Sequence, residues 1–164
     1  MPTPDDQWKQ RIADLWAAFD EHDPQAFLAK VKDMTDQLPA GNAIAEYELA
    51  SAHDSIGHEA EAAVHYRRAF AAGLPASHRR RATIQFASTL RNLGQADESV
   101  RLLTAERDAG SDELDDAVTA FLALALTDLG RDREAAALAL GALSRHLPRY
   151  NRSLANYAKA LMSP

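Results

Sequence analysis

Histidine and carboxylate side chains that could do chemistry gather in one short stretch of the chain. His53-Asp54 has the residue types of a general base and its carboxylate partner. Asp54, His58, Glu61 and His65 have residue types that bind metal ions. A glycine interrupts the helical spacing between Asp54 and His58, however, and Glu61 with His65 supplies only two ligands. The stretch therefore predicts no metal site and no cofactor, and we expect the protein not to be an enzyme.

His53 also has a structural interpretation. It occupies a position that is Leu in two related segments of the chain, which favours a buried, hydrogen-bonded imidazole. A less favoured alternative is a small-ligand or catalytic site around Tyr47, His53, Asp54 and Arg91, which depends on residue types alone. The chain has no phosphate-binding glycine loop, nucleophile elbow or paired-carboxylate motif that would support it.

A run of three arginines, Arg79 to Arg81, is the strongest local concentration of positive charge. It lies in the first turn of a predicted helix, where the helix dipole disfavours each exposed cation by about 0.3 kcal/mol or more. Two explanations remain open. An acidic ligand or partner could offset this cost, or Glu59 or Glu61 of the preceding helix could do so, and we favour the second.

The composition excludes several classes of protein. Because the 164 residues include no Cys, there can be no disulfide framework, thiolate zinc site or cysteine nucleophile. A hydrophobic content of 46% with 26% charged residues is typical of a globular domain. The N-terminal residues lack the apolar stretch of a signal peptide, and no window is apolar enough for a membrane span. We therefore expect a cytoplasmic protein that does not bind a membrane.

The charge is unevenly distributed along the chain. Residues 1–64 carry 13 acidic and 4 basic side chains, residues 65–110 carry 4 and 8, and residues 111–164 carry 7 and 6. The net charge of -6 argues against nucleic acid as a partner, because a phosphate-binding surface needs a sustained basic face. The acidic first third beside a basic middle suggests an alternative function, a structural protein that self-associates head to tail.

Those candidate residues are positioned by a repeat with a period of 36 to 37 residues. Its clearest column is formed by three glycines, Gly57, Gly94 and Gly130. Apolar residues recur at three- and four-residue spacing on both sides of each glycine, which predicts two helices joined by a tight turn. Other columns keep the same intervals: Leu49, Phe86 and Leu122; Ala50, Ala87 and Ala123.

The pattern predicts an all-α protein of about nine helices. Small residues in the Ala column allow the two helices of each hairpin to approach closely. The predicted helices span residues 5–20, 24–38, 42–56, 59–72, 77–93, 96–109, 112–129, 132–146 and 149–162. The last of these, with Tyr150, Leu154, Tyr157 and Leu161 on one face, is predicted to cover the open end of the stack.

These residues resemble the tetratricopeptide repeat. Leu49-Ala50, Gly57, Ala62, Tyr66 and Ala69 stand at the spacings of that motif. The stretch from Tyr47 to Gly57, with Arg79-Arg80-Arg81 and Ala87 to Gly94, is similar more narrowly to the bacterial group 5 tetratricopeptide family. The resemblance implies one domain over residues 1–164, a right-handed α-solenoid of stacked hairpins that acts as a binding scaffold. Its parts would be a degenerate helix pair (1–40), repeats (43–76, 80–112, 116–149) and a capping helix (149–162).

In such a solenoid the first helix of each pair lines a concave groove. We predict that this groove binds a protein or peptide, with an acidic group or C-terminal carboxylate held by arginines and amides. The alternative is that these positions are a solvated face whose charges pair with each other, as Asp54 could with Arg91. The groove positions are Tyr47, Glu48, Ser51, Asp54, Arg81, Gln85, Ser88, Arg91, Asn92, Phe121 and Leu124.

Overall fold

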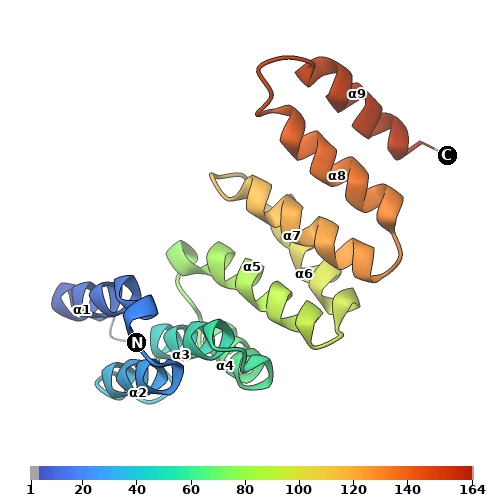
Figure 1. The fold of residues 1–164 in the computed structure, drawn as a ribbon. Coiled ribbons are helices and arrows are strands. Elements are labelled where there is room, and N and C mark those ends of the chain that lie inside the picture. Colours follow the sequence, from blue (N-terminus) through green and yellow to red (C-terminus); the bar gives the residue numbers. More distant parts are fainter. Residues whose placement is uncertain (1–3, 164) are drawn as a thin grey trace. The chain divides into compact units, whose positions relative to one another are not determined.

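The computed structural model describes residues 4–163, and within them the chain is a succession of α-helices without strands (Figure 1). Consecutive helices pack against each other along the chain, which confirms the all-α hairpin architecture. The helices are α1 (Asp6–Ala17), α2 (Pro24–Thr35), α3 (Ala43–Ser55), α4 (Glu59–Ala71), α5 (Ala76–Asn92), α6 (Ala96–Ala109), α7 (Asp115–Asp128), α8 (Asp132–Ser144) and α9 (Asn151–Leu161), with a 3-10 turn, η1 (Phe19–Glu21), after α1.

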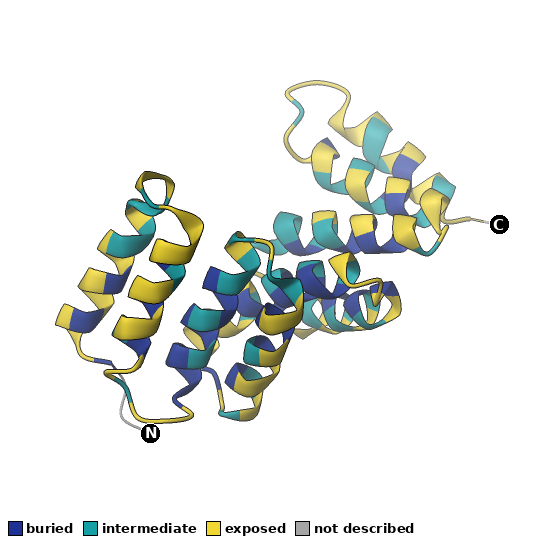
Figure 2. Ribbon diagram, turned by 60° about the horizontal axis from the view of Figure 1, so that its bottom comes forward, coloured by how far each residue is buried: buried dark blue, intermediate teal, exposed yellow. Residues whose placement is uncertain are grey.

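The chain divides into two compact units, each with its own core. Unit 1 extends to Ala82 and unit 2 begins at Thr83, so the division falls within α5. Figure 2 shows a buried stripe beside an exposed stripe on most of the helices, as expected for amphipathic helices.

The core of unit 1 is built largely from aromatic and branched side chains of its first helices. Trp8 and Ile12 of α1 pack with Phe27 and Val31 of α2 and with Ile44 of α3. Side-chain caps fix the helix starts: Asp5 accepts a hydrogen bond from the Trp8 amide, and Asn42 accepts from the amides of Ile44 and Ala45. The N-terminal helices, which do not follow the repeat motif, therefore belong to the same core as the first repeat.

Unit 2 has a more aliphatic core. Ile84 and Ala87 of α5, Leu103 of α6, and Val118 and Leu122 of α7 form one cluster with Ala135 of α8. The repeat position that carries alanine, and that was predicted to let the helices of each hairpin cross closely, is buried in every repeat. The exposed fractions are 0% for Ala50, 0% for Ala87 and 7% for Ala123.

The three turn glycines have the same backbone conformation. Gly57, Gly94 and Gly130 have φ values of 78°, 75° and 70°, in the left-handed region that residues with a side chain rarely adopt. In each case the next amide donates to the carbonyl five residues earlier, as His58 does to His53 at 2.9 Å. This is the Schellman helix end, so the glycine column is a requirement of the backbone at each hairpin turn.

The C-terminal helix differs from the prediction. The predicted segment begins at residue 149, but α9 begins at Asn151 after Tyr150, which has a φ of 65°. Tyr150 and Tyr157 were expected on the inner face of a capping helix, yet they are 77% and 71% exposed. Only Ala158 of α9 is buried. Leu154 and Leu161, also expected on that face, are half-buried, so α9 packs against α8 without burying its tyrosine.

Candidate functional site

Three of the predicted groove residues are buried within unit 1. Tyr47, Glu48 and Ser51 of α3 have exposed fractions of 5%, 8% and 5%, which corrects the expectation that they face solvent. Asp54, one turn further along, is half-buried and accepts a hydrogen bond from the Tyr66 hydroxyl at 3.5 Å. Only Arg81 is exposed among the predicted groove positions of this unit.

Trp16 of α1 explains much of that burial. Its indole Nε1 donates a hydrogen bond of 2.7 Å to the Glu48 carboxylate. Burial raises the pKa of Glu48, while the Trp16 bond and the nearby Arg81 charge act in the opposite direction. The sequence did not reveal this contact, because Trp16 belongs to the helix that departs from the repeat motif.

The histidines form a cluster on α3, α4 and the turn between them. The His53 ring stacks on His65 with ring centroids 5.4 Å apart, and its centroid lies 5.7 Å from that of His58. His65 Nδ1 donates to Glu46 at 2.7 Å. His53 is only half-buried, and its enclosed Nδ1 has no hydrogen-bond partner among the described residues, which corrects the expectation of a hydrogen-bonded core imidazole. In that part of the chain no group of three such side chains could hold a metal ion.

The arginine run contacts an aromatic ring and a carboxylate inside unit 1. The Arg79 guanidinium lies over the Phe70 ring, 5.7 Å from its centroid, in a cation–π contact. Arg81 lies close enough to Glu48 for its charge to offset part of the rise that burial causes in the Glu48 pKa. These contacts provide part of the compensation that the positive charge at the start of α5 requires. The two sources predicted from the sequence, an acidic ligand or the carboxylates of Glu59 or Glu61, stay predictions for the rest of this compensation.

Unit 2 brings the remaining predicted residues onto two neighbouring helices. Arg91 of α5 forms an ion pair with Asp128 of α7, so these two first helices of their hairpins lie side by side within the unit. Arg91 therefore has an acidic partner inside unit 2, and the suggested pairing of Arg91 with Asp54 stays a prediction. The other positions range from half-buried to exposed: Gln85, Ser88 and Phe121 are half-buried, Asn92 is exposed, and Leu124 is 45% exposed.

A groove that the sequence did not predict lies between α7, α8 and α9. We call it the α7–α9 groove; its volume is about 890 Å³. Small side chains from α8 and α9 provide much of its surface: Ala137, Gly141, Ala142, Ala155 and Ala158. The signal for it was the residue stretch 135–144, which contains no charged residue and includes Gly141, the only glycine inside one of the described helices. Small residues without charge form a smooth apolar surface.

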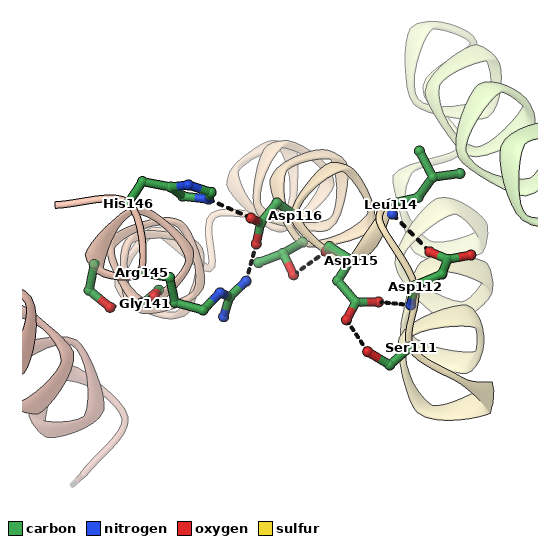
Figure 3. A network of polar contacts seen from close by, with 10 residues as sticks. Ser111, Asp112, Leu114, Asp115, Asp116, Gly141, Arg145 and His146 are labelled. Carbon is green, nitrogen blue, oxygen red and sulfur yellow. Dashed lines mark hydrogen bonds and ion pairs between the residues drawn. The ribbon is translucent and has the colours of Figure 1, made fainter.

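The acidic rim of this groove is formed by the start of α7 (Figure 3). Asp116 forms an ion pair with Arg145 and a hydrogen bond of 2.6 Å with His146, so it links α7 to the end of α8. Hydrogen bonding from His146, supported by Arg145, lowers the pKa of Asp116. Asp115 accepts hydrogen bonds from the Ser111 hydroxyl and the Asp112 amide, which orders the loop before α7.

Cations line the same groove. Arg107 pairs with Asp108 and Arg145 with Asp116, whereas Lys159 of α9 has no ion pair among residues 4–163. The groove thus has an acidic rim on α7, an apolar floor, and an uncommitted positive charge on α9. Such an arrangement can bind a segment of polypeptide.

Comparison with known families decides what kind of protein this is. The model of the tetratricopeptide repeat, group 5, matches residues 43–161, well over half of the chain. The chain belongs to the tetratricopeptide repeat family. The resemblance that the residue columns predicted is therefore confirmed. Searches among curated proteins and among solved structures give no match.

Membership of the tetratricopeptide repeat family fits the structure described above. Family members are in general scaffolds for protein–protein interaction. In this tetratricopeptide repeat chain, none of the described helices has the length and apolar character needed to cross a membrane. The repeats supply the helices, and the departures from the motif, at Trp16 and at α9, produce the buried α3 face and the α7–α9 groove.

Proposed function

We propose that this protein is a non-catalytic scaffold that binds a segment of a partner polypeptide, and that the α7–α9 groove of unit 2 holds that segment. The observation that most supports the proposal is the groove itself. A volume of about 890 Å³ over a floor of Ala and Gly side chains suits a peptide backbone or the side of a helix.

The charges around the groove specify the partner's chemistry. Lys159 pairs with an acidic side chain or a terminal carboxylate, since the other two cations lining the groove are already paired. Glu113, an exposed residue of the loop before α7 that lines the groove, favours a basic residue on the other side of the bound segment. The exposed positions predicted on α5 and α7, above all Asn92 and Leu124, form a second surface along which the same partner can continue.

Gly141 provides a sharp test of the groove. A Cβ built at this glycine meets no atom within 4 Å, so the first atom of a side chain fits there without a clash. Gly141→Leu fills the floor of the groove, and Lys159→Glu reverses its free charge. We expect both variants, immobilised and exposed to lysate, to lose the proteins that the unmodified chain retains, as identified by mass spectrometry.

The matched control is Gly141→Ala, which adds only a methyl group and should retain the same proteins. Leu124→Glu separates the two surfaces, because it alters the α7 face outside the groove. If Gly141→Leu and Lys159→Glu retain the full set of proteins while Leu124→Glu loses it, the partner binds the first helices of the hairpins and the assignment to the α7–α9 groove is wrong.

A further inference from the structure

The walls of the α7–α9 groove offer few backbone groups to a bound segment. Its floor and one wall are turns of α8 and α9, whose amides and carbonyls are bonded within their own helices. In the loop before α7, the Asp112 amide donates to the Asp115 carboxylate and the Leu114 amide donates to the Asp112 carboxylate. An extended peptide recognised through its backbone therefore finds few partners here. A helix needs none, because it satisfies its own backbone.

The side chains of the groove suit the close approach of a helix. Ala137 and Gly141 stand four residues apart on α8, and Ala155 and Ala158 stand three residues apart on α9. These are the spacings of neighbours on one helix face. The two helices lie side by side along the groove (Figure 1). Side chains as small as these let a third helix come close to both.

A row of positive charge runs along α9 at the edge of the groove. Lys159 lines the groove, and Arg152 precedes it by seven residues. Residues seven apart share one face of an α-helix and lie about 10 Å apart along its axis. Both side chains are exposed, and neither has an ion pair among residues 4–163. Residues 135–164 contain no Asp or Glu, so the segment that carries the row does not neutralise it.

The spacing of this row matches that of acidic residues on a helix. Carboxylates seven residues apart on a partner helix also lie on one face about 10 Å apart. In an extended segment, side chains on one face lie about 7 or 14 Å apart, which fits the row less well. None of the described helices of this chain carries two acidic residues seven apart. The row therefore selects a helix of a different protein and not a second copy of this one.

We propose that the segment bound in the α7–α9 groove is an amphipathic helix of another protein, with two acidic residues seven positions apart that pair with Arg152 and Lys159. This inference rests on the proposed function, because it names the partner of the same groove. The small side chains of the floor set the distance between the helices, and the row on α9 sets their register. Glu113, exposed in the loop before α7, favours a basic residue on the other flank of the bound helix.

Selection from two displayed peptide libraries tests the proposal. One library randomises the exposed face of a helix held in a stable helical scaffold. The other presents unstructured peptides of the same length and the same random composition. Groove-dependent clones are those that bind the unmodified chain and Gly141→Ala but not Gly141→Leu. We expect these clones to come from the helix library and to carry Asp or Glu at two positions seven apart.

Charge reversal then measures the contribution of each cation. Arg152→Glu and Lys159→Glu should each weaken binding of a selected helix by about three- to tenfold in fluorescence anisotropy, since repulsion replaces an exposed attraction. Replacing the facing acidic residue of the bound helix with lysine should restore the affinity of each variant. The matched control is Arg149→Glu, which reverses an exposed charge just before α9 and should leave the affinity nearly unchanged.

The possible failures of this inference and of the proposed function differ. If no clone distinguishes Gly141→Leu from Gly141→Ala, the groove does not bind polypeptide and the proposed function fails as well. If groove-dependent clones come from the unstructured library or lack the acidic pair, the groove binds polypeptide but the partner is not this helix. Equal effects of Arg149→Glu and Arg152→Glu also overturn the inference. So does self-association of the purified chain in sedimentation velocity that Arg152→Glu abolishes, because a second copy then occupies the row.

Discussion

The same substitution, glycine to alanine, should have opposite effects at two positions of unit 2. Gly141 lies inside α8, does not have a positive φ, and a Cβ added there meets no atom within 4 Å. Glycine in a helix interior is less stable than alanine by about 0.5–1 kcal/mol, chiefly because the unfolded chain has more freedom to lose. Gly141→Ala should therefore stabilise unit 2 by about that amount.

Gly130 gives the contrasting case. Its φ of 70° is left-handed, and the Arg131 amide that follows donates to the Leu126 carbonyl at 2.9 Å. A residue with a Cβ pays about 1–2 kcal/mol for this conformation. Although open space surrounds the position, Gly130→Ala should destabilise by about that amount, because the backbone and not the packing sets the cost.

Thermal unfolding followed by far-UV circular dichroism measures both effects. Since each kcal/mol shifts Tm by about 2–4 °C in a chain of this size, the two variants should lie on opposite sides of the unmodified protein and be separated by several degrees. Both glycines are in unit 2, so they report on the same transition even if the two units unfold separately. Equal destabilisation by both variants would refute the assignment of Gly141 to an unstrained site beside open space.

Two predictions concern titratable groups of unit 1. Burial, together with the nearby His65 and His58, lowers the pKa of His53, so protons bind the unfolded chain more readily and stability falls as pH drops from about 7 to about 5. His53→Leu should flatten that slope in urea unfolding at a series of pH values, and an unchanged slope contradicts the idea. Burial raises the pKa of Glu48, so its carboxylate opposes folding above its ordinary pKa. Glu48→Gln should raise the free energy of unfolding at neutral pH, and this gain should vanish in acid. Trp16→Phe removes the hydrogen-bond donor and should lower the free energy of unfolding by about 1–3 kcal/mol. The same urea experiment checks both variants, and a Glu48→Gln gain that persists in acid refutes the electrostatic cause.

The repeat could be predicted from the sequence because each hairpin turn needs the same backbone conformation. Only glycine satisfies a left-handed helix end without strain, so Gly57, Gly94 and Gly130 recur at fixed intervals. The alanine position that includes Ala50 and Ala87 is buried because the two helices of each hairpin approach closely there, which is also a requirement within the single hairpin. Features that each repeat must reproduce by itself leave a periodic signal.

The burial of α3 could not be predicted in this way. Glu48 is covered because Trp16, 32 residues earlier in the chain, donates to its carboxylate. Trp16 belongs to a helix outside the repeat, so no column of the motif contains that contact. A polar residue at a groove position therefore looks exposed in the sequence, although here it is buried under a neighbour that periodicity cannot identify.

The position of α9 depends on a difference of only a few atoms in α8. One position of the repeat packs against the next helix, and it is Tyr66 in α4 and Leu103 in α6. The same position in α8 is Ala139. Replacing Leu by Ala removes about 2 kcal/mol of apolar burial from that side. The opposite side offers Ala137 and Gly141, against which the alanines of α9 can pack closely. Because α9 packs on that side, the α7–α9 groove lies there, and the Ala139 side of α8 stays exposed.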